Sequence, residues 1–281
     1  MTVIHDPKEL QKTALALRAQ GKTIALVPTM GNLHDGHASL MDIARPRADV
    51  LIVSVFVNPT QFGPNEDYDK YPRTLEADKK VCESRGVDIV FAPANDSIYE
   101  ADASTFVNEH SCSQGLCGRS RPIHFRGVCT VVNLLFNLAQ PNVAVFGQKD
   151  AQQVAVLKRM VRDLHIPVEL VVGPIVRESD GLALSSRNQY LTSHERCAAP
   201  QIQATLKELA EKAETTKDAA KLSEFFMKRL SENAIFDAEY IEIVNNSTMI
   251  PVETIETGNT LVAVAVRMTE SRTRLIDNIL L

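Results

Sequence analysis

The sequence lacks several features that mark whole classes of protein. No apolar run in its 281 residues approaches the roughly 18–20 residues that a membrane-spanning helix needs, so no membrane partner is expected. The first residues have neither the basic end nor the apolar core of a signal peptide. The five cysteines are an odd number and thinly spread, which is typical of a reducing cytoplasm rather than of a disulfide framework. We therefore expect a cytoplasmic protein.

The sequence also has no excess of basic over acidic residues. The chain carries 30 Lys and Arg against 35 Asp and Glu, a net charge of −5, which argues against a nucleic-acid coat or a basic membrane-surface protein. Hydrophobic residues make up 44% and charged residues 23%, the balance of a globular rather than a disordered chain. Cys112 and Cys117 lie closest together, but no nearby His completes a zinc pattern. The net negative charge is compatible with binding of small anionic ligands, because such ligands need only a local positive site.

The first two-thirds of the chain alternates short β-rich apolar runs with helical patterns. Strands are expected at 23–28, 50–57, 87–92, 142–146 and 168–172, and helices near 37–47, 74–85, 127–139 and 150–163. Apolar runs without polar alternation are typical of strands buried on both faces. This alternation predicts a doubly wound, parallel α/β sheet, in which ligands bind beyond the carboxyl ends of the strands. Pro46 should end or bend the first of these helices.

The alternation of strand and helix patterns ends near residue 175. Residues 194–232 are interpreted as one long helical stretch rich in Ala, Lys and Glu, and residues 238–245 and 260–267 as strands. We therefore expect one domain over residues 1–175 and a smaller α+β domain over residues 176–281, placed as a lid over the mouth of the first.

The first expected strand leads into a loop, residues 28–37, that contains two glycines and two histidines. Gly31 and Gly36 permit tight turns, and His34 and His37 share a face at a helix start because they are three residues apart. A helix N-terminus directs N–H groups and a positive dipole toward an anion, and two imidazoles there can donate to phosphate oxygens. The same spacing occurs on plain helix faces and in metal sites. Its position after a buried strand favours phosphate binding.

Polar groups follow two further strands. Asn58 and Gln61 could bind a hydroxyl or a carboxylate, although an ordinary Asn-Pro turn also explains them. Gly147 at a turn, followed by Lys149 at a helix start, is typical of phosphate binding, and Gln153 lies one turn further along the Lys149 face. The alternative for Lys149 is an ordinary surface lysine.

A turn after the fifth expected strand gathers two hydroxyls and a guanidinium, those of Ser185, Ser186 and Arg187. These groups can hold phosphate oxygens from several directions. A Ser-rich turn with a solvated Arg is the plain alternative. Because four such signals fall at strand ends of one predicted sheet, we expect them to serve one function.

Seven runs of residues also occur in the order of a known family, almost from end to end: 27–37, 56–63, 71–74, 124–128, 146–150, 180–188 and 274–278. On these residues the chain resembles the pantothenate synthetase (pantoate–β-alanine ligase) family, within the HIGH-motif nucleotidyl transferases. The resemblance implies a Rossmann-type N-terminal domain that binds ATP and pantoate, a C-terminal lid and a homodimer. It implies ATP-dependent condensation of pantoate with β-alanine through a pantoyl adenylate, with release of AMP and pyrophosphate.

The resemblance also implies site residues, with His37 as an acid group and His34, Lys149, Ser186 and Arg187 beside it in catalysis. The implied ATP contacts are Met30, Gly31, Asn32, Leu33, His34, Asp35, Gly36, His37, Gly147, Gln148, Lys149, Asp150, the backbone of Val176, Leu184, Ser185, Ser186 and Arg187. Gln61 matches a contact to both pantoate and β-alanine, and Gln153 a contact to pantoate. A Mg²⁺ ion should accompany the nucleotide through phosphates and water. Its protein ligands stay unassigned, Asp78 being a guess.

Four features depart from the family pattern. Ile123 stands where Gly is common, and Leu184 stands where Met is frequent, a change that conserves volume. Asp35 occupies a variable position, and the turn at 268–272 is longer than usual. None of these departures removes a proposed catalytic group.

Three rival functions fit parts of the pattern. Another HIGH-motif adenylyl transferase could act on a different small carboxylate. A truncated class I aminoacyl-tRNA synthetase would share the His-x-Gly-His type of loop, but the chain shows no basic extension for tRNA, so no nucleic-acid partner is expected. A nucleotide-binding sensor that has lost its chemistry is disfavoured, because the polar groups that catalysis would need are all present.

Overall fold

The structure is a computed structural model that describes residues 1–64 and 66–281. The chain divides into two compact units. The first comprises residues 1–109, 121–148 and 156–174, and the second comprises residues 110–120, 149–155 and 175–281. The predicted domain boundary between residues 175 and 176 stays a prediction. No helix in the described ranges is long and apolar enough to cross a membrane.

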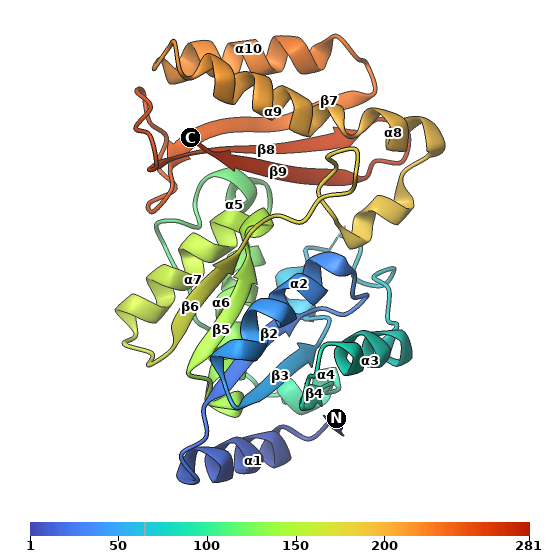
Figure 1. Ribbon diagram of the computed structural model, residues 1–281, viewed down its shortest axis with the longest axis vertical. Helices are drawn as coiled ribbons and strands as arrows, with labels where there is room; N and C mark the ends of the chain where they lie inside the picture. The colour runs from blue at the N-terminus through green and yellow to red at the C-terminus, as the bar shows by residue number, and fades with distance from the viewer. Residues whose placement is uncertain (65) are drawn as a thin grey trace. The chain divides into compact units, whose positions relative to one another are not determined.

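The first unit is built from alternating strands and helices (Figure 1). Its strands are β1 (Thr2–Ile4), β2 (Ile24–Thr29), β3 (Val50–Val55), β4 (Ile89–Phe91), β5 (Val143–Gly147) and β6 (Glu169–Gly173). Its helices are α1 (Pro7–Ala19), α2 (Asp35–Ala44), α3 (Leu75–Ser84), α4 (Asn95–Ile98) and α6 (His124–Ala139). Helix α7 (Ala151–Asp163) begins in the second unit and continues in the first.

The strands of the first unit form one parallel sheet in the order β1-β4-β3-β2-β5-β6. Because side chains alternate between faces along a strand, Ala25 and Val27 of β2 pack toward α2, while Ile24 and Leu26 point to the opposite face. All four are fully buried. The strands are therefore covered on both faces, which confirms the doubly wound α/β prediction.

Pro46 acts on the chain as predicted. Helix α2 ends at Ala44 and continues only as a 3-10 turn over Arg45–Arg47. Proline lacks a backbone N–H and its ring crowds the preceding turn, so the α-helical hydrogen bonds cannot continue past it.

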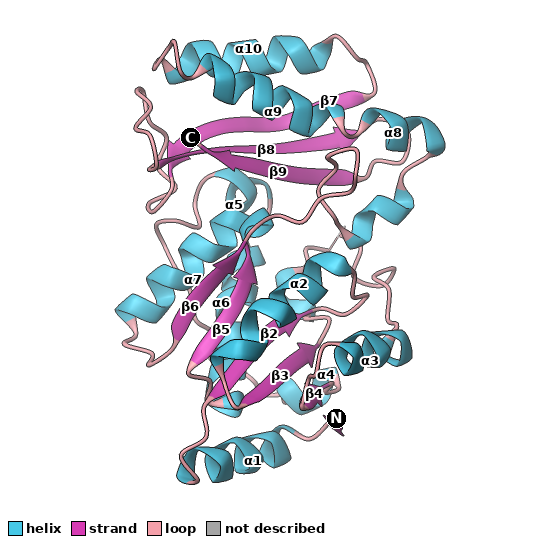
Figure 2. Cartoon of the chain, viewed as in Figure 1, coloured by secondary structure: helices cyan, strands magenta, loops and turns pink. Residues whose placement is uncertain are grey.

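The second unit is the predicted α+β unit, with an antiparallel sheet in the order β7-β8-β9 (Figure 2). Its elements are α5 (Leu116–Ser120), α8 (Ser193–Ala198), α9 (Gln201–Lys212), α10 (Ala219–Ser231), β7 (Phe236–Asn245), β8 (Thr260–Met268) and β9 (Arg274–Leu280). Helices α9 and α10 pack on each other and cover the sheet, with Leu206, Leu209, Leu222 and Phe226 in the shared core.

The prediction of one long helix over residues 194–232 is wrong. The structure has three helices there, α8, α9 and α10. Pro200 separates the first two, since it cannot donate a backbone hydrogen bond. Asp218 accepts the N–H of Lys221 and so starts α10 afresh. The Ala, Lys and Glu content favours helix throughout but does not show these breaks.

Candidate functional site

The predicted site residues fall in both units. The loop at 30–37, Gln61, Gly147 and Gln148 belong to the first unit, and the remaining residues belong to the second: Lys149, Asp150, Gln153, Val176, Leu184, Ser185, Ser186 and Arg187. In the first unit they follow the carboxyl ends of β2, β3 and β5, where a doubly wound sheet binds ligands.

The loop after β2 has a backbone that favours glycine at one point. Gly31 has φ +80°, and a Cβ there would lie 2.9 Å from Oδ2 of Asp78 and 3.0 Å from Val55. Asn32 follows with φ 50°, a conformation that asparagine tolerates better than most residues. The loop therefore turns sharply directly behind the strand and leads into α2.

Asp78, on α3, holds this loop in place. Its carboxylate accepts the backbone N–H of Asn32 at 3.1 Å and of Leu33 at 2.8 Å, and the Thr74 hydroxyl at 3.2 Å. The residue is only 1% exposed. Both oxygens are thus committed to the loop, so the structure gives Asp78 a positioning role instead of supporting the guess that it binds a metal ion.

The burial of Asp78, which only the structure shows, agrees with this role. Asp78 and Cys82 are both buried on α3 and lie four residues apart on one helix face. An acidic residue on the apolar face of a helix is rarely buried without partners. Its buried position alone points to a network of hydrogen bonds.

His34 and His37 are oriented by the backbone at the start of α2. Nδ1 of His34 accepts the N–H of Gly36 at 3.2 Å, and Nδ1 of His37 accepts the N–H of His34 at 3.3 Å. The two ring centroids are 4.1 Å apart. An accepting Nδ1 carries no proton, so this network assigns the proton of each neutral ring to Nε2. Each neutral ring therefore carries its proton on Nε2, and phosphate binding by these two rings stays a prediction.

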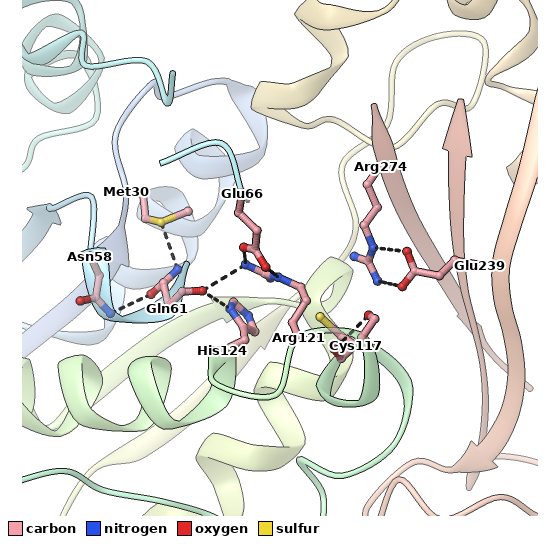
Figure 3. Close-up of polar contacts among 10 residues, drawn as sticks. Met30, Asn58, Gln61, Glu66, Cys117, Arg121, His124, Glu239 and Arg274 are labelled. Carbon is pink, nitrogen blue, oxygen red and sulfur yellow. Dashed lines mark hydrogen bonds and ion pairs between the residues drawn. The ribbon is translucent and has the colours of Figure 1, made fainter. Parts of the chain in front are cut away.

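Gln61 is held by side chains on both sides of its amide (Figure 3). Asn58 Nδ2 donates to Gln61 Oε1 at 3.1 Å, and Gln61 Nε2 lies 3.1 Å from the sulfur of Met30. Asn58 also accepts the Thr60 hydroxyl at 2.9 Å, as an ordinary turn residue would. Asn58 thus caps the turn and orients Gln61, while its contact to a hydroxyl or carboxylate stays a prediction.

The backbone carbonyl of Gln61 is fixed as well (Figure 3). Arg121 donates to it at 3.1 Å, and His124 Nδ1 lies at 3.0 Å. Arg121 in turn forms an ion pair with Glu66. Burial opposes ionisation of Glu66, but the Arg121 guanidinium outweighs it and holds the pKa of that carboxyl below its ordinary value. None of these three residues is predicted as a site residue; Arg121 and His124 lie three residues apart, and Glu66 lies 55 positions before Arg121.

Helix α6 approaches the Gln61 turn backbone to backbone. A Cβ at Gly127 would lie 2.4 Å from the carbonyl oxygen of Thr60 and 2.6 Å from Cα of Gln61. The helix begins just after Ile123, which has an ordinary right-handed backbone with φ −92°. Glycine at 123 is therefore not required by the backbone, whereas glycine at 127 is.

In the second unit, Lys149 lies in the 3-10 turn that follows β5. Its side chain is half-buried, and its ammonium makes no ion pair or hydrogen bond with the residues that the structure describes. Gln152 is buried and makes three hydrogen bonds to the backbone. It accepts the N–H of Cys117 and donates to the carbonyl groups of Cys112 and Gly115. Gln153 is half-buried beside it. The side chain of Gln152 therefore has a structural role.

The segment from Val176 to Asn188 forms a tight loop. Leu184 donates its N–H to the carbonyl of Val176 at 3.0 Å, and Ser185 Oγ accepts the N–H of Arg187 at 3.2 Å. Ser186 and Arg187 begin the 3-10 turn that Ser185 caps. The serine hydroxyls therefore differ in role, since that of Ser185 already caps the turn.

Asn188 was not predicted as a site residue. Its Nδ2 donates to the carbonyl of Ala183 at 3.1 Å, while its Oδ1 is buried without a hydrogen bond in the described part of the chain. Asn188 lines a cavity of the second unit together with Lys149, Ser185, Leu182 and Ile202. A buried acceptor beside residues that are predicted to bind phosphate can accept a hydrogen bond from a ligand or a water molecule.

The comparison with known proteins decides the family. Residues 2–280 match the family model of pantoate–β-alanine ligase. The chain belongs to the pantoate–β-alanine ligase family. It is 52% identical over 286 residues to the pantothenate synthetase of Maridesulfovibrio salexigens, covering 100% of this chain and 99% of that protein. It is 51% identical over 283 residues to that of Thermotoga neapolitana, covering 100% of each.

Solved structures agree with this assignment to the pantoate–β-alanine ligases. The enzyme of Thermus thermophilus superposes with a TM-score of 0.93 at 42% identity, covering 99% of each chain. The ligase of Francisella tularensis, complexed with β-γ ATP and β-alanine, gives a TM-score of 0.77 at 34% identity, covering 100% of this chain and 97% of that one.

A pantoate–β-alanine ligase must handle an anionic nucleotide, and the described residues suit this more than metal chelation. No group of three or more His, Cys, Asp or Glu side chains within 1–64 and 66–281 is arranged to hold a metal ion. The side chains predicted to bind phosphate are donors: His34 and His37 in the first unit, and Lys149 and Arg187 in the second. The role of each predicted site residue stays a prediction.

Proposed function

We propose that this chain catalyses the ATP-dependent ligation of pantoate and β-alanine through a pantoyl adenylate. The end-to-end family match over residues 2–280 carries the proposal. Curated relatives about half identical over the full length bear the name pantothenate synthetase.

The proposed reaction has two covalent steps. In the first, a carboxylate oxygen of pantoate attacks the α-phosphorus of ATP, an O–P bond forms, and the bond to pyrophosphate breaks. In the second, the amine of β-alanine attacks the activated carbonyl, an amide bond forms, the nitrogen loses a proton, and AMP leaves. No protein nucleophile takes part, so catalysis consists of positioning and charge stabilisation.

The phosphate groups of ATP are bound by side chains that donate hydrogen bonds. The Nε2–H groups of His34 and His37 donate to phosphate oxygens, with His37 as the acid group. Lys149 supplies a mobile positive charge, and Arg187 a planar guanidinium that can hold two oxygens at once. Ser186 supports them with its hydroxyl. These donors stabilise the charge that develops as pyrophosphate leaves.

The backbone and neighbouring side chains complete the ATP contacts. These are made by Met30, Gly31, Asn32, Leu33, Asp35, Gly36, Gly147, Gln148, Asp150, Val176, Leu184 and Ser185. Support for the loop comes from Asp78, which fixes the Asn32 and Leu33 amides, and from the left-handed turn at Gly31. A loop held this rigidly loses little entropy when it binds phosphate.

Gln61 and Gln153 bind the small substrates. Gln61 contacts both pantoate and β-alanine, and Gln153 contacts pantoate. The support for Gln61 is its fixed amide, which Asn58 and Met30 hold in one orientation inside a buried site. An amide oriented in advance can place the carboxylate of pantoate for attack.

A Mg²⁺ ion is part of the proposal and would neutralise phosphate charge when it is bound. Because Asp78 already accepts three hydrogen bonds, the ion would be held mainly by phosphates and water. A homodimer and a cytoplasmic location are also proposed from the family resemblance. The five cysteines are free thiols, as in a reducing compartment.

Omission of single reactants from an AMP-release assay tests the proposed function. With ATP, Mg²⁺, pantoate and β-alanine present, continuous AMP release is expected. Without β-alanine, one pyrophosphate per enzyme should be released as the adenylate forms and no AMP should follow, and without pantoate neither product should appear. Continuous turnover on another small carboxylate, with pantoate inert, would instead identify a different adenylyl transferase.

A further inference from the structure

Asn278, on the edge strand β9, holds the backbone of Lys149. Its Nδ2 donates to the carbonyl oxygen of Lys149 at 3.0 Å, across 129 positions of the sequence. Asn278 is 4% exposed, and the hydrogen bond is partly buried. Both residues belong to the second unit. A partly buried bond of this kind constrains the turn at 148–150 more firmly than an exposed one would.

Asp277 fixes Asn278 and a second segment of the same unit. One oxygen of Asp277 accepts the N–H of Asn278 at 2.8 Å, and the carboxylate forms a two-pronged ion pair with Arg177 at 2.6 and 2.9 Å. Arg177 also donates to the carbonyl of Gly181 at 3.1 Å. Because adjacent side chains of a strand point to opposite faces, this dipeptide can hold two separate loops.

The position of the Lys149 side chain depends on a fixed backbone. It has four rotatable methylene groups, and its ammonium pairs with none of the described residues. Its backbone is therefore the part of the residue with a defined position. A shift of that backbone would move the ammonium away from the phosphates even though the charge itself is unchanged, and a displacement of about 1 Å can cost up to 10²-fold in rate.

We propose that Asn278 is a positioning residue that acts on the reaction through Lys149. This inference rests on the proposed phosphate role of Lys149. Its amide donates to the Lys149 carbonyl and so fixes the backbone of that residue. The strand β9 thereby sets the position of a cation that belongs to a turn far away in the sequence.

A double-mutant cycle tests this coupling. Asn278→Ala should lower kcat for AMP release about tenfold while the KM for pantoate stays unchanged. In the Lys149→Ala background, the same change should lower kcat by less than about twofold, because the group it positions is gone. An equal loss in both backgrounds would show that Asn278 acts only on the fold and would overturn the proposal. An unchanged kcat in Asn278→Ala would overturn it too.

Asn245→Ala provides a matched control. Asn245 lies on β7 of the same sheet, and its Oδ1 accepts the backbone N–H groups of Ser247 and Thr248, each at 3.0 Å. Its removal should lower the melting temperature without changing kcat. If Asn278→Ala does not fold, Asn278→Ser, whose side chain is too short to reach the Lys149 carbonyl, takes its place in the cycle.

Calorimetric titration with a non-hydrolysable ATP analogue separates failure of the inference from failure of the proposed function. If the native protein releases no AMP with pantoate and β-alanine, the proposed function fails, and the affinity for the analogue replaces kcat in the cycle. Weaker binding of Asn278→Ala than of the native protein, with no difference in the Lys149→Ala background, supports the inference. Equal losses in both backgrounds, or no loss, would overturn it.

Discussion

Two histidines three residues apart acquire a defined chemistry from the backbone around them. His34 and His37 each accept a backbone N–H on Nδ1, which leaves Nε2 as the protonated nitrogen of the neutral ring. Neither ring can therefore act as a base through Nδ1 without breaking its own hydrogen bond. The spacing predicts a shared face, whereas the tautomer follows only from the structure.

Removal of one phosphate donor should cost rate without costing the fold. His37→Ala and Lys149→Ala should each lower kcat for AMP release by about 10²-fold, because each removes a donor to charge that develops in the transition state. His194→Ala is the matched control, since His194 is an exposed histidine that contacts Glu270. Initial rates and thermal unfolding of the three variants check this. Near-normal turnover in either of the first two would contradict its assigned role.

The cysteines should differ sharply in reactivity. Burial, and then the charges of Asp78 and Glu83, raise the pKa of the Cys82 thiol to about 12. Burial, and then Glu109, raise the pKa of Cys129 to about 12. Since the thiolate is the reactive form, both should resist iodoacetamide at pH 8. Cys197 is exposed and should be alkylated first, as peptide mass spectrometry can show. Early labelling of Cys82 or Cys129 in the folded protein would refute the burial argument.

At the scale of elements, the contact between α6 and the Gln61 turn leaves no room for a side chain. Gly127→Ala would place a methyl group 2.4 Å from the carbonyl oxygen of Thr60, so the helix or the turn must move. We expect a loss of about 1–3 kcal/mol in the free energy of unfolding and a raised KM for pantoate, because Gln61 moves with the turn.

Gly115→Ala is the control for this substitution, since the nearest heavy atom to its Cβ would be 3.8 Å away. Chemical denaturation and steady-state kinetics on both variants measure the two effects. If Gly127→Ala lost stability but kept its KM for pantoate, the turn would not carry the substrate contact assigned to it.

Glu195 ties helix α8 to the turn between β8 and β9. Its carboxylate accepts the N–H groups of Glu270 and Ser271 at 3.0 and 2.8 Å, and that of Thr192 at 3.0 Å. Burial opposes its ionisation, but these hydrogen bonds outweigh burial and hold its pKa below the ordinary value of 4.5. The turn between β8 and β9 is thus fixed by a buried acid.

This lowered pKa predicts an acid-dependent stability. Because the folded pKa of Glu195 is below its unfolded value, its contribution is complete above pH 4.5 and is lost as the pH falls through the folded pKa. Glu195→Gln should lower the free energy of unfolding at pH 7 by about 1–3 kcal/mol, and the two proteins should converge on acidification.

Urea denaturation from pH 7 down to pH 3 can follow this convergence. Glu76→Gln serves as the control, because the Glu76 side chain is 81% exposed and pairs with Lys79 at the surface. It should leave the unfolding curves unchanged. A constant difference between native protein and Glu195→Gln at all pH values would argue against the titration of Glu195.

Across the whole molecule, the sequence predicts what depends on local pattern. The apolar runs place the buried strands of the sheet, and the strand ends place the loop at 30–37, Gln61 and Lys149. The short edge strand β1, helix α1 and the strand β9 were not predicted, although Arg274–Asn278 was recognised as a family motif. Edge strands are weakly marked because they are short or lack a continuous apolar run.

The residues that the sequence did not predict act across long distances in the chain. Asp78 contacts the loop 45 positions earlier, Arg121 contacts Gln61 across 60 positions, and Asn278 contacts Lys149 across 129. No periodicity or spacing links such pairs. Each is a polar side chain whose partner is a backbone group, so its role becomes visible only when the tertiary fold brings the two together.

Isotope exchange between pyrophosphate and ATP tests the central claim most directly, because it isolates the formation of the pantoyl adenylate. With Mg²⁺ and pantoate present, labelled pyrophosphate should enter ATP in the absence of β-alanine, and no exchange should occur without pantoate. Exchange that requires β-alanine, or that an amino acid drives in place of pantoate, would contradict the account.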